Sequence, residues 1–514
     1  MDASRDPTGA VPFTTPSGRP FEAGTRGFWK DYPNTSALLA ELGIKESDVF
    51  TDFTTSAFYS PDGLEATAPV FAGAPLQLPS PLGQVFASFD NFKRLPLSDR
   101  ASMAGLLLAM LDFDRDEESM AAYDRMTAHE LCIRCGLSKR LVDDFVRPTL
   151  SVGLFAPLET TSALVALELL YFYAFAHQDS FDVRWIKTRS ISELLIAPLA
   201  QKLQQQHGLR VLSSARAEGL DMDAAGRVST VRYTQNGVSD SLSDIDAVVL
   251  AVGAKGMRAV VAGSPALAAC APELTAAASL GSLDVVTTRL WLDRRVAAPH
   301  PANVLSRFKQ LRGAGGTFFM LDQLQGDTDA GMRRLWGVPE ADLSTATPTG
   351  SVVACDFYNS AAVALLSDQE IVDTLMRDLL PSAVSGFQGA QVLDSYVLRL
   401  PGAVSWFSPG SFPSRPPLRG SVPNLVCAGD WVRLGQREHG AKGLCQERAF
   451  VTGLEAGNAL LRGALPGLSA AAALLHPVLP VRADEPQVLA GKQAAQAAAA
   501  LARALSMPPS PWVR

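Results

Sequence analysis

The stretch that decides the fold, residues 424–433, reads NLVCAGDWVR. A short apolar run at 425–428 ends in Gly429 and Asp430, and a sequence rich in small residues, HGAKGLCQERAFVTGLEAGNALL, follows at 439–461. In open α/β sheets, ligands bind in the crevice beyond the carboxyl ends of the strands. The stretch therefore predicts a buried strand that delivers the carboxylate of Asp430 to such a crevice, where sugar-like hydroxyl groups can donate hydrogen bonds to it.

The segment after this strand is predicted to be a helix with small side chains on one face. Ala449, Gly453, Ala456 and Leu460 follow one another at spacings that place them on one side of a helix. Three of the four are small enough to let a sheet or a flat cofactor approach closely. The helix start, near residues 443–446, offers free backbone N–H groups and the positive end of the helix dipole, which suits an electron-rich oxygen. A strand–helix corner that binds nothing remains the alternative.

Composition favours a large globular chain without nucleic-acid binding. The chain has 514 residues, of which 47% are hydrophobic, and this length exceeds what one core normally supports, so we expect two domains. A net charge of −7 argues against a sequence-independent nucleic-acid binder.

Cys132 and Cys135 form a C-x-x-C without a second pair at metal-ligand spacing, so we expect two ordinary helix residues and no metal site. No targeting segment is visible at the N-terminus.

Two kinds of pattern alternate along the chain. Residues 95–171 are predicted to be helical, whereas an amphipathic helix at 191–208 and a strand from 209 onward begin an α/β unit. The run at 247–252 is apolar throughout, as a strand covered on both faces should be. Later runs alternate between apolar and polar residues, which predicts an antiparallel sheet with one covered face; these runs are 282–296, 316–324 and 351–360.

We therefore expect a substrate domain built in two pieces around a returning α/β domain. The expected α/β segments are 1–60, which would be a remnant, 185–262 and 396–465. The expected substrate domain consists of a helical part, 61–184, and a sheet part, 263–395. A helical tail is expected at 466–514.

The residues around Asp430 resemble the C-terminal flavin motif of the flavin amine oxidase and phytoene desaturase superfamily. In that superfamily an A-G-D/E strand end precedes a helix of the type M-E-G-A-x-x-S-G. Glu447, Ala449 and Gly453 match this helix, whereas Arg448 stands where glycine is usual. The resemblance implies an α/β, two-domain FAD-dependent oxidoreductase, with an incomplete Rossmann-type FAD domain and an α+β substrate domain that has an antiparallel sheet and a helical block.

The resemblance also implies contacts to FAD. It directs Asp430 toward the ribityl chain and the Gln446 amide toward the isoalloxazine, and it places Ala217 at the adenine and Gly253 at the pyrophosphate side. The implied set of FAD contacts is Glu22, Gly24, Ala217, Gly253, Gly429, Asp430, Gln446, Glu447 and Ala449. On the substrate side it implies Trp406 and Phe407, and His439 adjoins the flavin helix. No catalytic residue is indicated, and no metal is implied.

One departure concerns the first nucleotide-binding unit. The superfamily opens with a strand–G-x-G-x-x-G–helix–strand unit that is not found in this sequence. We expect neither RGAGGT, from Arg312, nor AVGAKG, from Ala251, to follow a strand and open a helix within a βαβ unit. We therefore expect an incomplete version of a longer protein, and the alternative is a chain that has lost tight flavin binding.

The helical block resembles the carotenoid-desaturase-like branch most. This implies desaturation or isomerisation of a carotenoid-like or isoprenoid substrate by hydride transfer to flavin, with peripheral membrane association, in a plastid or photosynthetic membrane. Aromatic residues of the block are candidates for a tunnel wall or a packed core: Phe172, Tyr173, Phe175 and Phe181. The alternatives are a flavin amine oxidase acting on a small amine, which would fit the cytoplasm, and a truncated non-catalytic family member. The substrate, the electron acceptor and the oligomeric state are not indicated.

Overall fold

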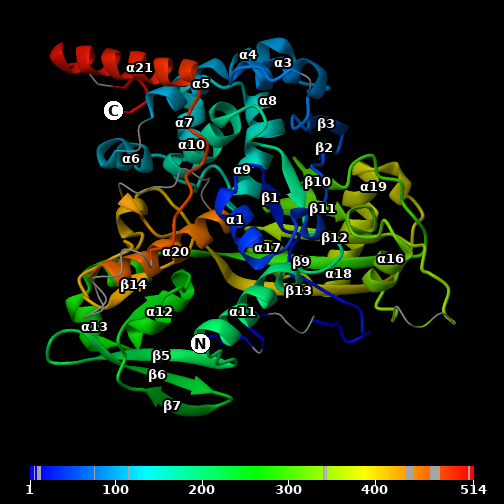
Figure 1. Cartoon of the computed structure of the whole chain (residues 1–514). Helices are drawn as coiled ribbons and strands as arrows, with labels where there is room; N and C mark the ends of the chain where they lie inside the picture. Colours follow the sequence, from blue (N-terminus) through cyan, green and yellow to red (C-terminus); the bar gives the residue numbers. More distant parts are fainter. Residues whose placement is uncertain are drawn as a thin grey trace.

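The computed structural model describes residues 1–4, 6–8, 13–74, 76–113, 116–339, 342, 344–435, 444–463, 475–507 and 510–513. Three parts surround the centre of the molecule (Figure 1). A large sheet with its covering helices lies on one side, a block of helices lies above, and a smaller α/β unit lies below. This arrangement places the segments around Asp430 beneath the helical block.

A seven-stranded sheet forms the first part. Its order is β13-β9-β12-β11-β10-β2-β3, and neighbours are antiparallel except β10 and β2. The three runs predicted to be strands contain β9, β11 and β12, but the second strand ends at Met320, and the last four residues of its run form α15 (Leu321–Leu324). The strands are β2 (Ser56–Ser60), β3 (Gly63–Ala68), β9 (Ser282–Leu292), β10 (Ala302–Leu305), β11 (Gly315–Met320), β12 (Val352–Tyr358) and β13 (Val392–Ser405).

Both faces of this sheet are covered, so the prediction of one covered face was wrong. On the first face, Val286, Phe318 and Val353 pack against α18 (Asp368–Asp373) and the helical turns that follow it. The second face meets α9 (Arg147–Gly153), where Gly315 lies so close to Ser151 that an added Cβ would approach its Cβ to 3.0 Å. Every residue of β12 is buried, because helices brought in from both sides exclude water.

β13 is the longest strand and forms one edge of the sheet. It pairs with β9 along most of its length, with register shifts between Val392 and Asp394 and between Leu400 and Val404. Its carboxyl end leads to Trp406 and Phe407.

The helical block holds the largest apolar core. Leu106, Leu131 and Leu164 are fully buried in it, and Thr127 caps α7 by accepting a hydrogen bond from the backbone N–H of Glu130. Cys132 and Cys135 are buried free cysteines, as expected of ordinary helix residues. The helices are α3 (Leu82–Asn91), α4 (Leu97–Ala101), α5 (Ala104–Asp112), α6 (Glu117–Asp124), α7 (Ala128–Arg134), α8 (Lys139–Leu141), α9 and α10 (Ala163–Tyr171).

The α/β unit contains a parallel pair of strands, β8 (Val248–Leu250) and β14 (Leu425–Cys427). A hairpin sheet packs below it, and β6 and β7 join at Asn236 and Gly237, both with positive φ, as predicted. Its remaining elements are β5 (Ala215–Met222), β6 (Val228–Gln235), β7 (Val238–Leu242), α1 (Pro33–Leu42), α2 (Glu46–Val49), α11 (Ala197–His207), α12 (Ala254–Ala262) and α20 (Gln446–Gly463). Short connecting elements are β1 (Gly27–Trp29), β4 (Val183–Trp185), α13 (Pro265–Cys270), α14 (Pro272–Ala278), α15 (Leu321–Leu324), α16 (Asp329–Leu335), α17 (Ala361–Ala364) and α19 (Leu380–Ala383).

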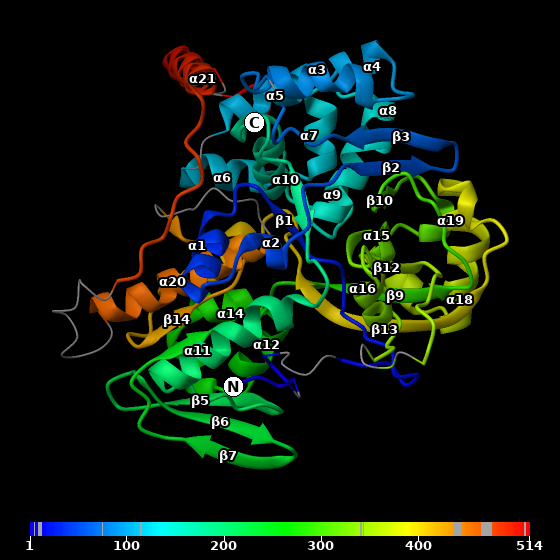
Figure 2. The same ribbon diagram turned by 45° about the vertical axis from the view of Figure 1, so that its right-hand side comes forward.

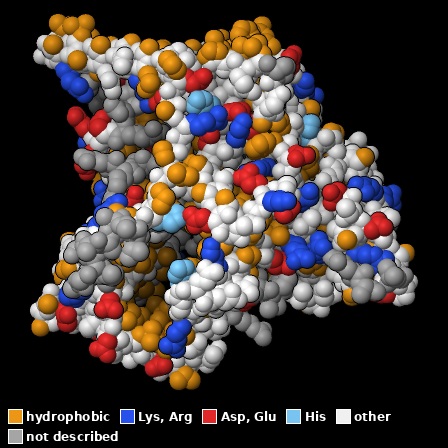
Figure 3. Space-filling model, viewed as in Figure 1, with side chains coloured by type: hydrophobic (Ala, Val, Ile, Leu, Met, Phe, Trp, Pro, Cys, Tyr) orange, Lys and Arg blue, Asp and Glu red, His pale blue; other side chains and the backbone are white. Residues whose placement is uncertain are grey.

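Two strand predictions in this unit need correction. β8 is shorter than the predicted run at 247–252, and its central residue, Val249, is 44% exposed rather than covered on both faces. The strand predicted from residue 209 begins only at Ala215. Among the described residues, β8 has β14 as its single neighbour, so an apolar strand lies open along one edge. Figure 3 shows a hollow with hydrophobic side chains in this part of the molecule.

The C-terminal segment crosses the surface before ending in α21 (Pro486–Ala504), as Figure 2 shows. Arg482 forms ion pairs with Asp31 and Asp179. Val488 is buried against the helical block, so the segment links the lower unit to the upper one. No helix within the described ranges has the length and apolar character to cross a membrane.

Candidate functional site

The turn after β14 is held against α20 by its backbone. Gly429 adopts a φ of 128°, a conformation that side chains disfavour, and a Cβ there would lie 3.0 Å from Cδ1 of Trp431. The Gly429 N–H donates to Oγ1 of Thr452 at 2.9 Å. The Thr452 hydroxyl also lies 3.1 Å from the Gly429 carbonyl oxygen. Glycine is therefore required at this turn, as the A-G-D motif implies.

Two buried guanidinium groups bind three consecutive carbonyl oxygens of the turn. Arg448 donates to Asp430 O at 2.7 Å and to Val432 O at 2.9 Å. Arg415 donates to Trp431 O at 2.8 Å. Burial raises the pKa of the Asp430 carboxyl above its usual value, and the positive charges of Arg448 and Arg415 oppose that shift. Arg448, the departure from the superfamily pattern, thus stabilises the turn that positions Asp430.

The side chain of Glu447 binds the start of α1. Its carboxylate is fully buried and accepts hydrogen bonds from the backbone and side chains of Asn34 and Thr35, at the first turn of α1. Phe28 and Leu39 share one apolar cluster with Cys445, just before α20. The start of α20 and the N-terminal segment therefore form one packed unit.

The small residues of α20 form an exposed face, although a different one from that predicted. Ala449 is exposed, and a Cβ added at Gly453 or Gly457 would meet no atom within 4 Å. Ala456, which was predicted to share this face, is fully buried. The open face is thus built on Ala449, Gly453 and Gly457.

The N-terminal candidates lie against the large sheet. Glu22 accepts a hydrogen bond from the backbone N–H of Ile191, and its own carbonyl oxygen accepts one from Arg289. Burial raises the pKa of the Glu22 carboxyl. Gly24 has a φ of 75°, and a Cβ there would lie 4.0 Å from a carboxylate oxygen of Asp356.

Gly253 lies at the beginning of α12, directly after β8. A Cβ at Gly253 would meet only Oγ of Ser405, at 3.8 Å, so the helix start has free space beside it. The segment from Ala251 follows β8 and opens α12, but the next strand, β9, belongs to the seven-stranded sheet, so the segment lies in no βαβ unit, as predicted. RGAGGT, by contrast, precedes and enters β11. Ala217 is half-buried in β5, opposite Tyr233.

The aromatic candidates are engaged in packing. The Trp406 indole N–H donates to Thr160 O at 3.0 Å, and Phe407 is buried beneath the guanidinium of Arg415, 4.8 Å from its ring centroid. In the helical block, Phe172 and Phe175 are buried, and Tyr173 packs edge-on against Phe181. His439 lies outside the described residues.

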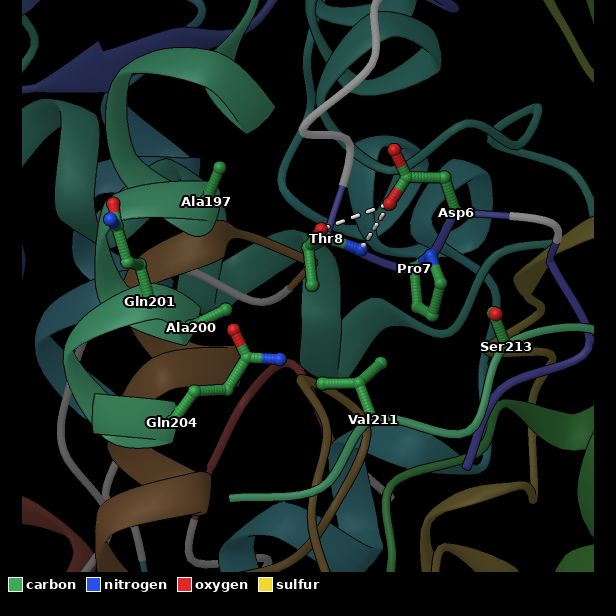
Figure 4. Close-up of a pocket in the computed structure, with 9 residues that line it drawn as sticks. All are labelled: Asp6, Pro7, Thr8, Ala197, Ala200, Gln201, Gln204, Val211 and Ser213. Atoms are coloured by element: carbon green, nitrogen blue, oxygen red, sulfur yellow. Dashed lines mark hydrogen bonds between the residues drawn. The ribbon is translucent and has the colours of Figure 1, made fainter. Parts of the chain in front are cut away.

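A cavity of about 370 Å³ opens beside α11 (Figure 4). Gln201 and Gln204 contribute its polar lining from α11, and Asp6 accepts hydrogen bonds from the N–H and hydroxyl of Thr8 at its rim. Its lining includes no lysine or arginine, so it lacks the cations that usually accompany a pyrophosphate. None of the implied FAD contacts lines it.

Several residues of the site were not predicted from the sequence. Arg415, Thr452, Asp356 and Arg289 all contact segments that the resemblance assigned to FAD. Asp356 carries a recognisable signal, since it is the one charged residue of an apolar strand, whereas β9, which holds Arg289, contains other polar residues. The described residues hold no cluster of side chains suited to a metal ion.

The chain belongs to the family of flavin containing amine oxidoreductases, whose sequence pattern matches residues 9–456. Its relatives include the 15-cis-phytoene desaturase of Solanum lycopersicum, which is 21% identical over 80% of this chain and 65% of that protein. The carotenoid phi-ring synthase of Chlorobaculum tepidum is 28% identical over 43% of this chain and 33% of that protein. The chain thus spans about two thirds of the length of the desaturases it matches.

Solved structures confirm the predicted fold class. A double mutant of putrescine oxidase has a TM-score of 0.57 at 13% identity, with 90% of this chain and 93% of that one covered. Cyclohexylamine oxidase from Brevibacterium oxydans has a TM-score of 0.52 at 13% identity, with 84% of this chain and 87% of that one covered.

Family membership confirms the predicted superfamily and its oxidoreductase class and supports FAD as the cofactor. The residues fit this group, since an added Cβ at Gly453 or Gly457 on α20 would meet no atom within 4 Å, which leaves room for a flat ring.

Proposed function

We propose that the protein is an FAD-dependent oxidoreductase that oxidises a lipophilic, isoprenoid-like substrate. The turn at Gly429 and Asp430 beside the open face of α20 is the observation that supports the flavin site. FAD, when bound, supplies a hydride acceptor. The chain's own contribution is to hold the ring on the small-residue face and to offer the Asp430 carboxylate to hydroxyl groups of the cofactor.

The substrate class rests on likeness and on composition. The phytoene desaturases match most of the chain, and the carotenoid phi-ring synthase matches part of it. Trp406 and Phe407 contact protein groups rather than framing a cage for a small amine. These observations favour a lipophilic substrate over a small amine, and desaturation or isomerisation is the proposed reaction type.

The proposed partner is a bilayer surface, which α3 would contact. Its exposed face consists of Leu82, Val85, Phe86 and Phe89, each between 42% and 57% exposed. These positions lie one helical turn apart on one side. We call this group the α3 surface. Hydrophobic side chains gather along the top of the molecule over α3 and α4 in Figure 3.

Charge supports a lipid rather than a protein partner for the α3 surface. Residues 66–89 contain no charged side chain, although much of the segment is exposed. The exposed Asp90 follows directly, and Lys93 and Arg94, which come next along the chain, are also exposed. Apolar helices with basic residues at their border bind the interface of bilayers that contain anionic lipid. A location at a membrane surface is therefore part of the proposal, and a plastid stays a prediction.

The experiment that tests the function uses the whole natural protein. It would be purified, and its flavin would be measured by absorbance after denaturation and identified by chromatography. Phytoene in vesicles would then be added under anaerobic conditions while bleaching of the flavin band is followed. We expect bound FAD and bleaching by phytoene, whereas putrescine and cyclohexylamine should leave the flavin oxidised. A protein without flavin, or one bleached only by the amines, contradicts the proposal.

A further inference from the structure

A buried polar cluster lies on the second face of the large sheet, beside the implied flavin contacts. Asp356 on β12 pairs with Thr287 on β9 and with Thr317 on β11 in the sheet register. Arg289, two residues after Thr287, projects from the same face. Asp356 is 1% exposed and Arg289 is 6% exposed. A carboxylate and a guanidinium are thus buried together in a region that is otherwise apolar.

The N-terminal segment covers this cluster. The Thr25 N–H donates to Oδ2 of Asp356 at 3.4 Å, and Arg289 donates to the Glu22 carbonyl oxygen at 3.3 Å. Arg26 is exposed, and its charge acts on Asp356. The cluster therefore lies just below the surface, between the sheet and the segment that holds Glu22 and Gly24.

Three polar atoms of the cluster are buried without a hydrogen-bond partner among the described residues: Thr25 Oγ1, Arg289 Nε and Asp356 Oδ1. Buried polar atoms in proteins are nearly always paired, and a concentration of unpaired ones indicates a group that the chain itself does not supply. A group that accepts a hydrogen bond from Arg289 and donates one to Asp356 would pair two of these atoms.

The charges restrict the chemistry of that group. An ammonium ion would meet the positive charge of Arg289, and a carboxylate would meet the negative charge of Asp356. A neutral hydroxyl both donates and accepts, as the cluster requires. We propose that Thr25, Arg289 and Asp356 bind an alcohol hydroxyl of the substrate, so that a hydroxylated isoprenoid is preferred over the corresponding hydrocarbon. This inference rests on the proposed function.

The surroundings suit a molecule with one polar end. Tyr358, on the same strand as Asp356, packs edge-on against Phe155 with ring centroids 4.6 Å apart. Phe21 lies 5.3 Å from the Arg289 guanidinium. Aromatic rings thus border the cluster on two sides. Burial raises the pKa of the Asp356 carboxyl and lowers that of Arg289 to about 10, and both shifts would shrink once a hydroxyl solvates the two groups.

The test compares two ligands that differ in one hydroxyl. Geranylgeraniol and the hydrocarbon that lacks its hydroxyl would be titrated in detergent into the FAD-loaded full protein, with binding followed by the flavin spectrum and by equilibrium partition. The variants are Thr25→Val and Asp356→Asn, and Thr234→Val on β6 is the matched control. Flavin content and thermal unfolding would show that each variant is folded.

We expect the alcohol to bind at least about tenfold more tightly than the hydrocarbon, which corresponds to one or two hydrogen bonds. Thr25→Val and Asp356→Asn should remove most of that preference while hydrocarbon affinity stays constant, and Thr234→Val should keep it. If FAD-loaded protein binds both ligands equally, only water fills the cluster; the inference is overturned and the proposed function stands. If the protein lacks FAD and binds neither ligand, both are overturned. Thr25→Val alone decides the matter if Asp356→Asn does not fold.

Discussion

Glu447 and Asn34 are joined by two hydrogen bonds to one carboxylate oxygen, from the backbone N–H of Asn34 at 2.8 Å and from its side-chain amide at 2.7 Å. The other oxygen binds the N–H and the hydroxyl of Thr35. Backbone N–H groups in the first turn of a helix lack partners within the helix, so a residue on α20 caps α1. Residues near the end of the stretch that matches the family are thereby hydrogen-bonded to residues near its beginning.

Glu447→Gln should destabilise the fold strongly. The amide would bring an NH₂ group against donors that now bind a carboxylate, so we expect a loss of about 2–4 kcal/mol in the free energy of unfolding. Urea unfolding followed by circular dichroism measures it. Glu118→Gln, on the exposed side of α6, is the control and should change stability by less than about 0.5 kcal/mol. Equal stability of the two variants would refute the capping role.

Gly429→Ala should weaken both folding and flavin retention. The substitution forces a side chain into a positive-φ conformation and against the Trp431 ring, with an expected cost of about 1–3 kcal/mol. Gly226→Ala, in the turn between β5 and β6, is the matched control, because this glycine also has a positive φ, 71°, but an added Cβ there would meet no atom within 4 Å; it should cost some stability and leave the flavin content unchanged. Thermal unfolding and the flavin-to-protein ratio are the measurements. A Gly429→Ala protein with unchanged flavin content would remove this turn from the site.

Arg448→Met should loosen the turn that holds Asp430. Two carbonyl oxygens, those of Asp430 and Val432, lose their donor, and each unpaired buried group costs about 1–3 kcal/mol. Unfolding in urea and the dissociation rate of FAD are the readouts. Arg462→Met, at an exposed arginine of the same helix, should behave like the unmodified protein. Similar behaviour of the two variants would show that the turn is held by other contacts.

Phe86→Ser with Phe89→Ser should reduce binding to vesicles. Full burial of a phenylalanine side chain in an apolar phase is worth about 1.5–3 kcal/mol, so the double variant should lose more than about tenfold in partition to phosphatidylcholine vesicles with added phosphatidylglycerol. Sedimentation of the vesicles measures it. Val238→Ser, at an exposed valine of β7, controls for general hydrophobicity. Unchanged sedimentation of the double variant with vesicles contradicts the bilayer proposal. The proposal is also contradicted if the unmodified protein is a dimer and the double variant is a monomer, because the α3 surface would then bind a second copy of the chain.

The sequence predicted elements whose neighbours are local or strongly patterned. β9, β11 and β12 lie in runs rich in apolar residues, and the turn at Asn236 and Gly237 follows from residues that accept positive φ. The strand expected from residue 209 starts six residues late, at Ala215. Strand assignment there depends on partners in space, which periodicity does not reveal. The cover on both faces of β12 likewise comes from helices distant in sequence.

The site was predictable at its backbone and less so at its side chains. Gly429 and the helix after it were identified from their motif, since glycine and small residues encode close approach. The partner of Glu447 lies 413 residues away, so no local pattern indicates that its carboxylate caps α1. The open face of α20 includes Gly457 rather than Ala456, because tertiary packing decides which side of the helix is buried.

β13 has a mechanical consequence for the whole molecule. The strand spans fourteen residues, or roughly 46 Å at the usual rise per residue, and its end at Ser405 reaches Gly253 in the α/β unit. β13 therefore forms the edge of the large sheet and also contacts the start of α12. Gly402, with a φ of 64°, lies inside the second register shift, where the strand departs from regular pairing with β9. The position of the start of α12 is therefore coupled to the edge of the large sheet.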